Sequence, residues 1–347
     1  MDDVNPPIRV KLLGRQRVSD MILRRQFPND DPVWGRCKFA FDHDEKDYDW
    51  LVVYDELPPA GERLRCPAQN TLLITTEPAT IKVYPTAYLG QFAHVLTSQE
   101  PFAVNHPGVI RSQCALVWYF GLPLGDDQAP LRHYDQIANN PLPIKDKTIS
   151  TVCSNKAMGH TLHKLRYDFV QAIDAVMPEL DVFGRGVREI KDKAEALDHY
   201  KYHLAIENHL APHHITEKLT DTYLAGALPF YFGAPNASDY FPAESFIPID
   251  IRNTAEAIDQ VRQAIADNEY EKRLPAIMEA RRQTLEEQNM FAVLSKLIEQ
   301  LDKGDRGDSG KHLLNRRVQR RRNPLRATTG LIHRYRVQAK LRRESAR

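Results

Sequence analysis

Residues 202–250 read YHLAIENHLAPHHITEKLTDTYLAGALPFYFGAPNASDYFPAESFIPID, and the order of apolar and polar segments in this stretch decides the fold. An apolar strand is predicted over 202–206, followed by a polar loop that carries several histidines. A helix with an apolar face is predicted to begin at Thr216, and a second apolar strand is predicted over 228–232. Strand, helix and strand in this order form a βαβ unit, which predicts a parallel sheet.

The start of the predicted helix has the chemistry of an anion site. Thr216 is a suitable N-cap, and the backbone N–H groups after it have no partners within the helix, so this end carries partial positive charge. Lys218 adds a full positive charge. The alternative is that Glu217 and Lys218 are ordinary solvated charges of a first helical turn. The local sequence leaves both interpretations open.

Across the same stretch the sequence resembles the donor-binding signature of the family 10 glycosyltransferases, the α1,3/4-fucosyltransferases, in their bacterial form. The matching residues are Glu207-Asn208, His214, Thr216–Leu219, Ala225–Pro229, Phe232–Pro235, Tyr240–Pro242 and Ser245–Ile247. The resemblance weakens in the first 140 residues and is absent from the tail. It implies an α/β protein of the GT-B type, with two Rossmann-like domains that face a cleft and ligands at the carboxyl ends of the strands.

The resemblance also implies an inverting fucosyltransferase that uses GDP-fucose. Its implied donor-binding residues are Arg166, Asn208, His214, Thr216, Glu217 and Lys218. Arg166 lies in a helix predicted over 160–176, and its planar guanidinium can bind two phosphate oxygens at once. Local sequence alone does not separate Arg166 from Lys164 or from an ordinary surface arginine. His209 and His214 stand where the family often has a serine and a tyrosine, which leaves the donor sugar less firmly implied than the fold.

Glu77 is the candidate for the catalytic base. It follows an apolar run over 72–76, and Pro78 prevents that strand from continuing. Taken alone, Glu77 is more simply a loop glutamate in water. The family, however, places its general base at a similar strand exit, in a turn that resembles Glu77-Pro78-Ala79.

The implied mechanism follows from the charges that develop during transfer. Arg166 and Lys218 would stabilise the GDP leaving group, while Glu77 removes the proton of an acceptor hydroxyl on the opposite face of the sugar. No cofactor is required, no residue is assigned to a metal, and a divalent metal would at most stimulate the reaction. The expected acceptor is an N-acetylglucosamine or glucose unit of a lipopolysaccharide-type glycan.

Two alternatives stay open. The chain could be a glycosyltransferase of the same fold that uses another nucleotide-activated sugar, or a non-catalytic protein that binds glycans or membranes. The sequence contains no P-loop, no G-x-S-x-G nucleophile elbow and no H-E-x-x-H zinc helix, which argues against other common enzyme classes.

Several other features are interpreted as structural. The acidic stretch 42–49 is predicted to be a solvated loop rather than a metal site, and Gly184-Arg185-Gly186 a turn near the nucleotide pocket. The four cysteines are Cys37, Cys66, Cys114 and Cys153. They lack zinc-binding spacing and are predicted to be buried thiols.

The chain is predicted to divide into three parts. Residues 1–143 would form an N-terminal acceptor-side α/β domain, with strands over 8–14, 50–55, 71–76 and 91–97. Residues 144–302 would form the GDP-sugar donor-binding domain, which begins with a strand over 148–153. Residues 303–347 would be a flexible linker and a basic tail.

The tail differs sharply in charge from the rest of the chain. Residues 311–347 contain 13 Lys or Arg and one acid, whereas the first 310 residues contain 34 basic and 45 acidic residues. Such a tail suits an anionic membrane surface, nucleic acid or a solvated disordered segment. The membrane surface is favoured, and no nucleic-acid partner is expected, because no aromatic stacking platform accompanies the charge.

Sequence composition also predicts where the protein acts. No apolar run approaches the roughly 20 residues that span a bilayer, and the first residues lack the apolar core of a signal peptide. The expected location is therefore the cytoplasm, with peripheral association to the inner face of the membrane.

Overall fold

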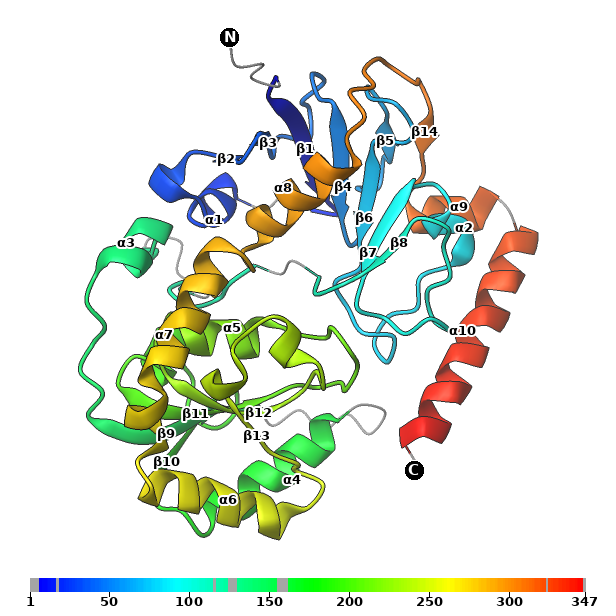
Figure 1. Ribbon diagram of the computed structural model, residues 1–347. Helices are drawn as coiled ribbons and strands as arrows, with labels where there is room; N and C mark the ends of the chain where they lie inside the picture. The colour runs from blue at the N-terminus through cyan, green and yellow to red at the C-terminus, as the bar shows by residue number, and fades with distance from the viewer. Residues whose placement is uncertain are drawn as a thin grey trace. The chain divides into compact units, whose positions relative to one another are not determined.

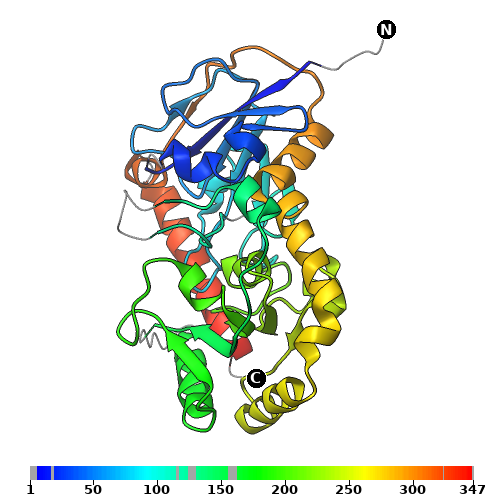
Figure 2. The same ribbon diagram turned by 90° about the vertical axis from the view of Figure 1, so that its left-hand side faces the viewer.

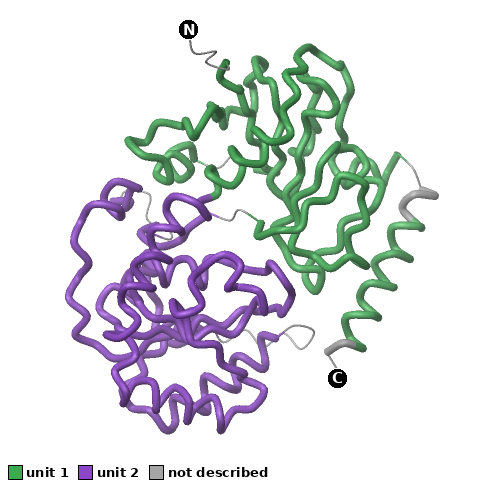
Figure 3. Tube along the Cα trace, in the orientation of Figure 1, with its two compact units in different colours: residues 1–115, 290–347 green, residues 116–289 purple. Residues whose placement is uncertain are grey.

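The computed structural model describes residues 6–16, 19–114, 117–123, 130–154, 162–322 and 324–345 (Figure 1). The chain divides into two compact units (Figure 3). The first contains residues 1–115 and 290–347, and the second contains residues 116–289. The predicted boundaries at 143 and 302 are corrected by this division. Phe120 and Ile137 pack with Leu224 and Leu285 of the second unit, which draws the segment before 143 into that unit.

The first unit is built on a seven-stranded sheet. Its strands are, in spatial order, β2 (Val33–Trp34), β3 (Cys37–Ala40), β1 (Ile8–Gly14), β4 (Trp50–Tyr54), β6 (Thr71–Ile74), β7 (His94–Thr97) and β8 (Val109–Arg111). All neighbours are parallel except β2 and β3. The four strands predicted for this region are confirmed, three of them with tighter limits.

The helices of the first unit include α1 (Asp20–Arg24), α2 (Thr86–Leu89) and α8 (Met290–Leu301). Although α8 comes late in the chain, its Phe291 ring stacks on Phe27 at 4.0 Å between centroids and meets the edge of Phe39 at 5.0 Å. Residues 290–301 therefore belong to the first unit, because their aromatic anchor completes its core.

The second unit has a five-stranded, all-parallel sheet. Its order is β10 (Leu180–Phe183), β9 (Lys147–Val152), β11 (Tyr200–Ile206), β12 (Leu228–Phe232) and β13 (Ile247–Pro248). Tyr202 of β11 lies opposite Leu228 of β12, so the predicted βαβ unit is confirmed. Two units that each carry a parallel α/β sheet confirm the predicted GT-B fold class.

Helices cover both faces of this sheet. They are α3 (Tyr134–Asn139), α4 (His163–Asp174), α5 (Glu217–Leu224), α6 (Thr254–Ala266) and α7 (Glu269–Glu286). Residues of α4 and α6 pack on one face, α5 packs on the other, and α7 runs along one side of the unit (Figure 2). The sheet is thus buried on both faces, which explains why β12 is a continuous apolar run and why β11 is apolar apart from Lys201 and His203.

Helix α4 is shorter than predicted. It begins at His163 and ends at Asp174, rather than spanning 160–176, and residues 155–161 lie outside the described part of the chain. Pro178 follows closely and cannot continue a helix, which accounts for the earlier end.

Helix α5 ends in a Schellman motif at Gly226. The N–H of Gly226 donates to Tyr223 O, and the N–H of Ala227 donates to Thr222 O. Gly226 has φ +70°, and a β-carbon there would lie 2.4 Å from a methyl group of Leu142. This tight helix end directs the chain straight into β12.

Replacing Gly226 with alanine is therefore expected to lower the free energy of unfolding by about 1–2 kcal/mol, because a left-handed backbone is costly for a residue with a β-carbon. Chemical unfolding followed by circular dichroism measures the change. Gly304 has φ +78°, and a β-carbon there would have no heavy atom within 4 Å, so Gly304→Ala tests the backbone cost without the contact. Unchanged stability of the Gly226 variant would contradict this account of the helix end.

The C-terminal region, predicted to be a flexible linker and a basic tail, contains regular structure from residue 312 onward. Strand β14 (His312–Leu313) pairs antiparallel with β5 (Glu62–Arg63), and Leu313 is fully buried. Helices α9 (Arg316–Arg322) and α10 (Pro324–Ser345) follow. Arg316 forms an ion pair with Glu56 at 2.8 Å, so part of the basic charge is used within the first unit.

The last helix has its own apolar contacts with that unit. Val337 and Leu341 of α10 are buried against Ala79, Val83 and Ala103. Composition alone does not reveal these contacts, because it gives no sign of a distant apolar surface that the tail can cover. No helix among the described residues combines the length and apolarity needed to cross a membrane.

Candidate functional site

A cavity of about 280 Å³ lies in the second unit, where β9, β10 and β11 end and α5 begins. Four of the predicted donor-binding residues line it: Arg166, Asn208, Glu217 and Lys218. Gly184 and Arg185 also line it, which confirms that the predicted turn lies at the pocket. His214 and Thr216 stand beside the cavity wall rather than in it. The carboxyl ends of parallel strands are where α/β sheets bind ligands.

The start of α5 is fixed by a buried carboxylate. Glu207, fully buried at the end of β11, accepts hydrogen bonds from the Thr216 N–H at 2.9 Å and from the Thr216 hydroxyl at 2.7 and 2.8 Å. Thr216 in turn caps the helix, because its Oγ1 accepts from the Lys218 N–H at 3.3 Å. The predicted N-cap is confirmed, and its role is to aim the first turn of α5 at the cavity.

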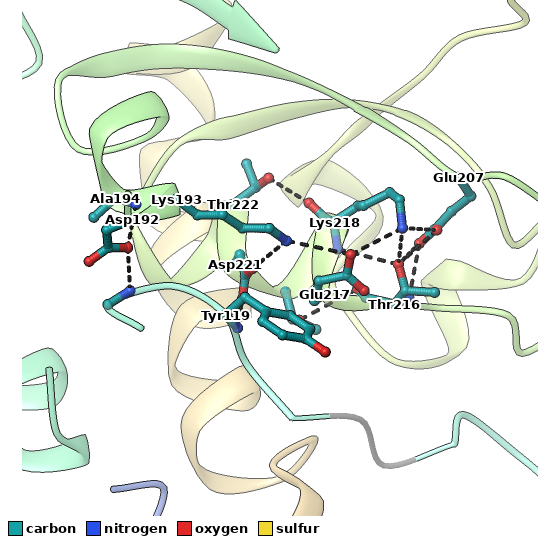
Figure 4. Close-up of polar contacts among 12 residues, drawn as sticks. Tyr119, Asp192, Lys193, Ala194, Glu207, Thr216, Glu217, Lys218, Asp221 and Thr222 are labelled. Atoms are coloured by element: carbon teal, nitrogen blue, oxygen red, sulfur yellow. Dashed lines mark hydrogen bonds and ion pairs between the residues drawn. The ribbon is translucent and has the colours of Figure 1, made fainter. Parts of the chain in front are cut away.

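Lys218 is held between carboxylates (Figure 4). Its Nζ lies 3.1 Å from Glu217 Oε1, 3.4 Å from Glu207 Oε2 and 3.0 Å from Thr216 Oγ1. Burial opposes the charged form, but Glu217 and Glu207 outweigh it and raise the pKa of Lys218. The ammonium therefore remains charged in the cavity wall, as an anionic ligand requires.

Arg166 and Asn208 bring unsatisfied polar atoms to the cavity. Arg166 is buried on α4, and its Nε has no hydrogen-bond partner within the described residues; the same holds for Asn208 Oδ1. Buried polar groups are nearly always paired in folded proteins, so these two atoms, on residues that line the cavity, are candidates to bind a ligand there. An anion would satisfy the guanidinium N–H, and a hydroxyl or amine would satisfy the amide oxygen.

The structure also resolves which basic residue of α4 faces the cavity. Lys164 is largely exposed and forms an ion pair with Asp168 one turn along the helix. Arg166 is 7% exposed and lines the cavity. The choice of Arg166 over Lys164, which local sequence could not make, is thereby supported by the geometry.

The histidine positions form a compact aromatic group next to α5. His209 and His214 are both buried, and their rings meet edge to face with centroids 5.2 Å apart. Burial lowers the pKa of His214 to about 3, so this ring is neutral at physiological pH. A neutral ring beside the cavity adds no charge to it.

Glu77 belongs to the first unit, in the turn that follows β6. Glu77 is exposed, and its backbone carbonyl accepts a hydrogen bond from Gln99 Nε2 at 2.6 Å. The same amide donates to Lys82 O at 2.9 Å, so the buried Gln99 holds both ends of the 77–82 turn. The predicted position at a strand exit is thus observed, on a turn with a defined backbone.

The charged cavity residues Lys193 and Asp221 were missed by the sequence interpretation, as was the role of Glu207 as a helix anchor beside the cavity. Asp221 lies one helical turn after Glu217, a spacing that could have placed both on one face of α5. Lys193 lies on the 3-10 turn η2 (Lys193–Ala196), outside the signature stretch that begins at residue 202. No local pattern could have associated it with the pocket.

The acidic stretch 42–49 is only partly a solvated loop, so that prediction is corrected at Asp49. Asp49 is buried, and its carboxylate pairs with Arg9 at 2.8 Å and Arg306 at 3.2 Å. Its charge is used to tie the loop to the first unit. Across the described ranges, no group of three or more His, Cys, Asp or Glu side chains is arranged to hold a metal ion. All four cysteines are free and buried, as predicted.

Comparison with known proteins adds independent findings. Residues 142–274 match the family model "Glycosyltransferase family 10 (fucosyltransferase) C-term". The chain is 26% identical over 238 residues to the alpha-(1,3)-fucosyltransferase FucT of Helicobacter pylori, covering 67% of this chain and 42% of that protein. It is 35% identical over 121 residues to the 4-galactosyl-N-acetylglucosaminide 3-alpha-L-fucosyltransferase FUT6 of Gorilla gorilla gorilla, covering 33% of each. The chain spans less than half the length of these curated relatives.

Solved structures agree at the level of fold. A crystal structure of an alpha1,3-fucosyltransferase superposes with a TM-score of 0.50 at 19% identity, covering 79% of this chain and 82% of that one. A second, with GDP, gives a TM-score of 0.50 at 18% identity, covering 86% and 92%. At this identity the similarity establishes the fold alone.

Proposed function

We propose that this chain is a member of glycosyltransferase family 10, whose model residues 142–274 match, and that it is an inverting α1,3-fucosyltransferase that transfers L-fucose from GDP-fucose to a glycan hydroxyl. The observation that carries the proposal is the pocket at the start of α5. It combines the orphaned Arg166 Nε, the orphaned Asn208 Oδ1 and a charged Lys218 in the first turn of a helix. This is a binding surface for a diphosphate joined to a hydroxyl-rich group.

On the donor side, the pocket residues would act on the leaving group. As the bond between fucose and GDP breaks, negative charge grows on the diphosphate, and fixed cations stabilise that charge more than they stabilise the intact donor. Arg166 supplies a planar fork and Lys218 a point charge. Glu217 would accept hydrogen bonds from ribose hydroxyls, while Asn208 and the neutral His214 orient the donor, and Thr216 maintains the helix start.

On the acceptor side, Glu77 would act as the general base. It would remove the proton of the attacking hydroxyl, so that one displacement inverts the anomeric centre. Gln99 supports this role by fixing the backbone carbonyls at both ends of the 77–82 turn. The proposed acceptor is an N-acetylglucosamine or glucose unit of a lipopolysaccharide-type glycan.

A panel of activated sugars tests the proposal. Purified protein is incubated with GDP-fucose, GDP-mannose and UDP-sugars and with oligosaccharides that end in N-acetylglucosamine or glucose, with a chelator or with added divalent metal. Transfer from GDP-fucose that persists in the chelator is the expected result. Transfer from a different donor would favour a glycosyltransferase of the same fold that uses another activated sugar. The histidines at 209 and 214, where the family often has serine and tyrosine, point to this alternative. Absence of both GDP binding and transfer would leave a non-catalytic glycan- or membrane-binding protein.

We also propose that α10 brings the enzyme to an anionic membrane surface on its cytoplasmic side. Leu331, Ile332 and Tyr335 are 54%, 48% and 74% exposed on a helix rich in arginine. Exposed apolar side chains among basic ones suit the interface of an anionic bilayer, at about 1 kcal/mol for each basic residue near the surface.

Vesicle sedimentation checks this membrane proposal. The protein is expected to sediment with vesicles that contain phosphatidylglycerol, to stay in solution with pure phosphatidylcholine, and to be released by salt. The triple variant Leu331→Ser, Ile332→Ser, Tyr335→Ser should bind more weakly while keeping its fold, because these side chains are exposed. Equal binding of the variant, or no binding at low salt, contradicts the role given to α10.

A further inference from the structure

Lys193 is a pocket residue whose backbone is held in place from two directions. It begins the turn η2, and its neighbour Asp192 caps that turn by accepting a hydrogen bond from the Ala194 N–H at 2.8 Å. The same carboxylate accepts from the Gly121 N–H at 3.0 Å. From this anchored position the Lys193 side chain extends toward α5, as Figure 4 shows.

The Lys193 ammonium lies between two carboxylates of one helix face. Its Nζ is 2.9 Å from Asp221 Oδ2 and 3.4 Å from Glu217 Oε1. Asp221 is 1% exposed, and its other oxygen accepts from the Tyr119 N–H at 3.1 Å. The Tyr119 ring also covers the ammonium, with Nζ 5.2 Å from its centroid. These contacts give the cation one defined position.

Glu217 is consequently held by two ammonium groups. Lys218 and Lys193 lie 3.1 and 3.4 Å from the same oxygen, Oε1, so Oε2 is needed for neither ion pair. Burial favours the neutral acid, but Lys218 and Lys193 outweigh it and hold the pKa of Glu217 well below its usual range. Glu217 therefore stays ionised inside the cavity wall.

The two lysines differ in what else they must do. Lys218 also contacts Glu207, and in the proposed function it faces the diphosphate, which competes with Glu217 for the same ammonium. Lys193 is held by Asp221, and the diphosphate does not compete with Glu217 for its ammonium in the proposed function. When the donor binds, Lys193 is the cation that continues to compensate the charge of Glu217.

We propose that Lys193 is a positioning residue that fixes Glu217 as an ionised acceptor for the hydroxyls of the nucleotide ribose, and so makes the pocket selective for ribonucleoside over 2′-deoxyribonucleoside diphosphates. The inference rests on the proposed function, in which this pocket holds the GDP part of the donor. Its distinctive consequence is that Lys193 affects the recognition of one hydroxyl group rather than nucleotide binding in general.

Calorimetric titration of GDP and 2′-deoxy-GDP tests the inference. The unmodified protein is expected to bind GDP about tenfold more tightly, since one hydrogen bond to a charged group is lost with the 2′-hydroxyl. Lys193→Met should weaken GDP binding about tenfold and 2′-deoxy-GDP binding little, so that the ratio of the two dissociation constants falls to near one. Lys193→Arg, which keeps the charge, should retain most of the selectivity.

Two further variants separate positioning from folding. Lys201 forms a comparable ion pair with Glu271 on the surface of the same unit, and Lys201→Met should leave both affinities unchanged. Glu217→Gln should lose the same selectivity as Lys193→Met, and combining the two should cause no further loss, because both changes remove one coupled interaction. If Lys193→Met folds poorly, the Glu217→Gln and Lys193→Arg results still decide the question.

The outcomes that overturn the inference are distinct from those that overturn the proposed function. If Lys193→Met weakened the binding of GDP and of 2′-deoxy-GDP equally, Lys193 would instead support the fold or the binding of the phosphates. Equal affinity of the unmodified protein for the two nucleotides would refute ribose selectivity while leaving GDP binding intact. Failure of the unmodified protein to bind either nucleotide would instead refute the proposed function.

Discussion

Replacing Glu77 with glutamine is expected to lower the rate of fucose transfer by about three orders of magnitude, because general-base catalysis typically contributes between about a hundredfold and ten-thousandfold. Glutamine has nearly the same shape but cannot accept the proton of the acceptor hydroxyl. GDP affinity should stay within about twofold, since Glu77 belongs to the first unit and the candidate donor pocket is formed by the second. Transfer rates and calorimetric GDP binding, measured on the same preparation, check both parts.

A suitable control for this variant is Glu244→Gln, which changes an exposed glutamate outside the pocket and should alter neither quantity. A Glu77→Gln enzyme that transfers fucose at the original rate would mean that another group takes the proton. A loss of GDP affinity would instead place Glu77 on the donor side of the reaction.

Replacing Arg166 with methionine is expected to weaken GDP binding by about 10- to 150-fold, because a charge-assisted hydrogen bond contributes about 1.5–3 kcal/mol. The fall in kcat/KM should be larger, about a thousandfold or more, since the diphosphate carries more charge in the transition state than in the bound donor. The buried Arg166 Nε, which has no protein partner among the described residues, is the group that the phosphate would satisfy.

Lys164→Met provides a matched control for the arginine variant. Lys164 lies on the same helix, but its ammonium is exposed and paired with Asp168, so its loss should change neither GDP affinity nor rate. Melting temperatures of both variants are needed, because Arg166 is buried and Lys164 is not. Equal effects of the two substitutions would indicate general electrostatic attraction rather than a specific phosphate contact.

Much of the fold could be predicted from the chain because the parallel sheets bury both faces of their strands. Runs such as 202–206 and 228–232 are apolar except for the buried His203, and their order with one helix determines a βαβ unit. The C-terminal region could not be predicted in this way. The pairing of 312–313 with 62–63 joins segments far apart in sequence, and neither two-residue strand has a pattern of its own.

Some residues of the candidate site could likewise be predicted from the sequence, and others could not. Thr216, Glu217 and Lys218 are adjacent in sequence, so a helix start was sufficient to place them together. Arg166 needed the structure to distinguish it from Lys164, because helix rotation decides which side chain is buried. Lys193 could not be found, since its place beside Glu217 depends on the path of the chain through Asp192 and Gly121.

The packing of α10 has a consequence for how this enzyme is handled. Val337 and Leu341 cover Ala79 and Val83, which belong to the segment directly after Glu77. A protein truncated before residue 324 to improve its expression yield would lose the helix that covers this segment, and the apolar side chains of the segment would be exposed to water. Helix α10 thus supports the segment next to Glu77, the proposed general base. An enzyme without α10 would therefore be a poor reference for measuring the catalytic contribution of Glu77.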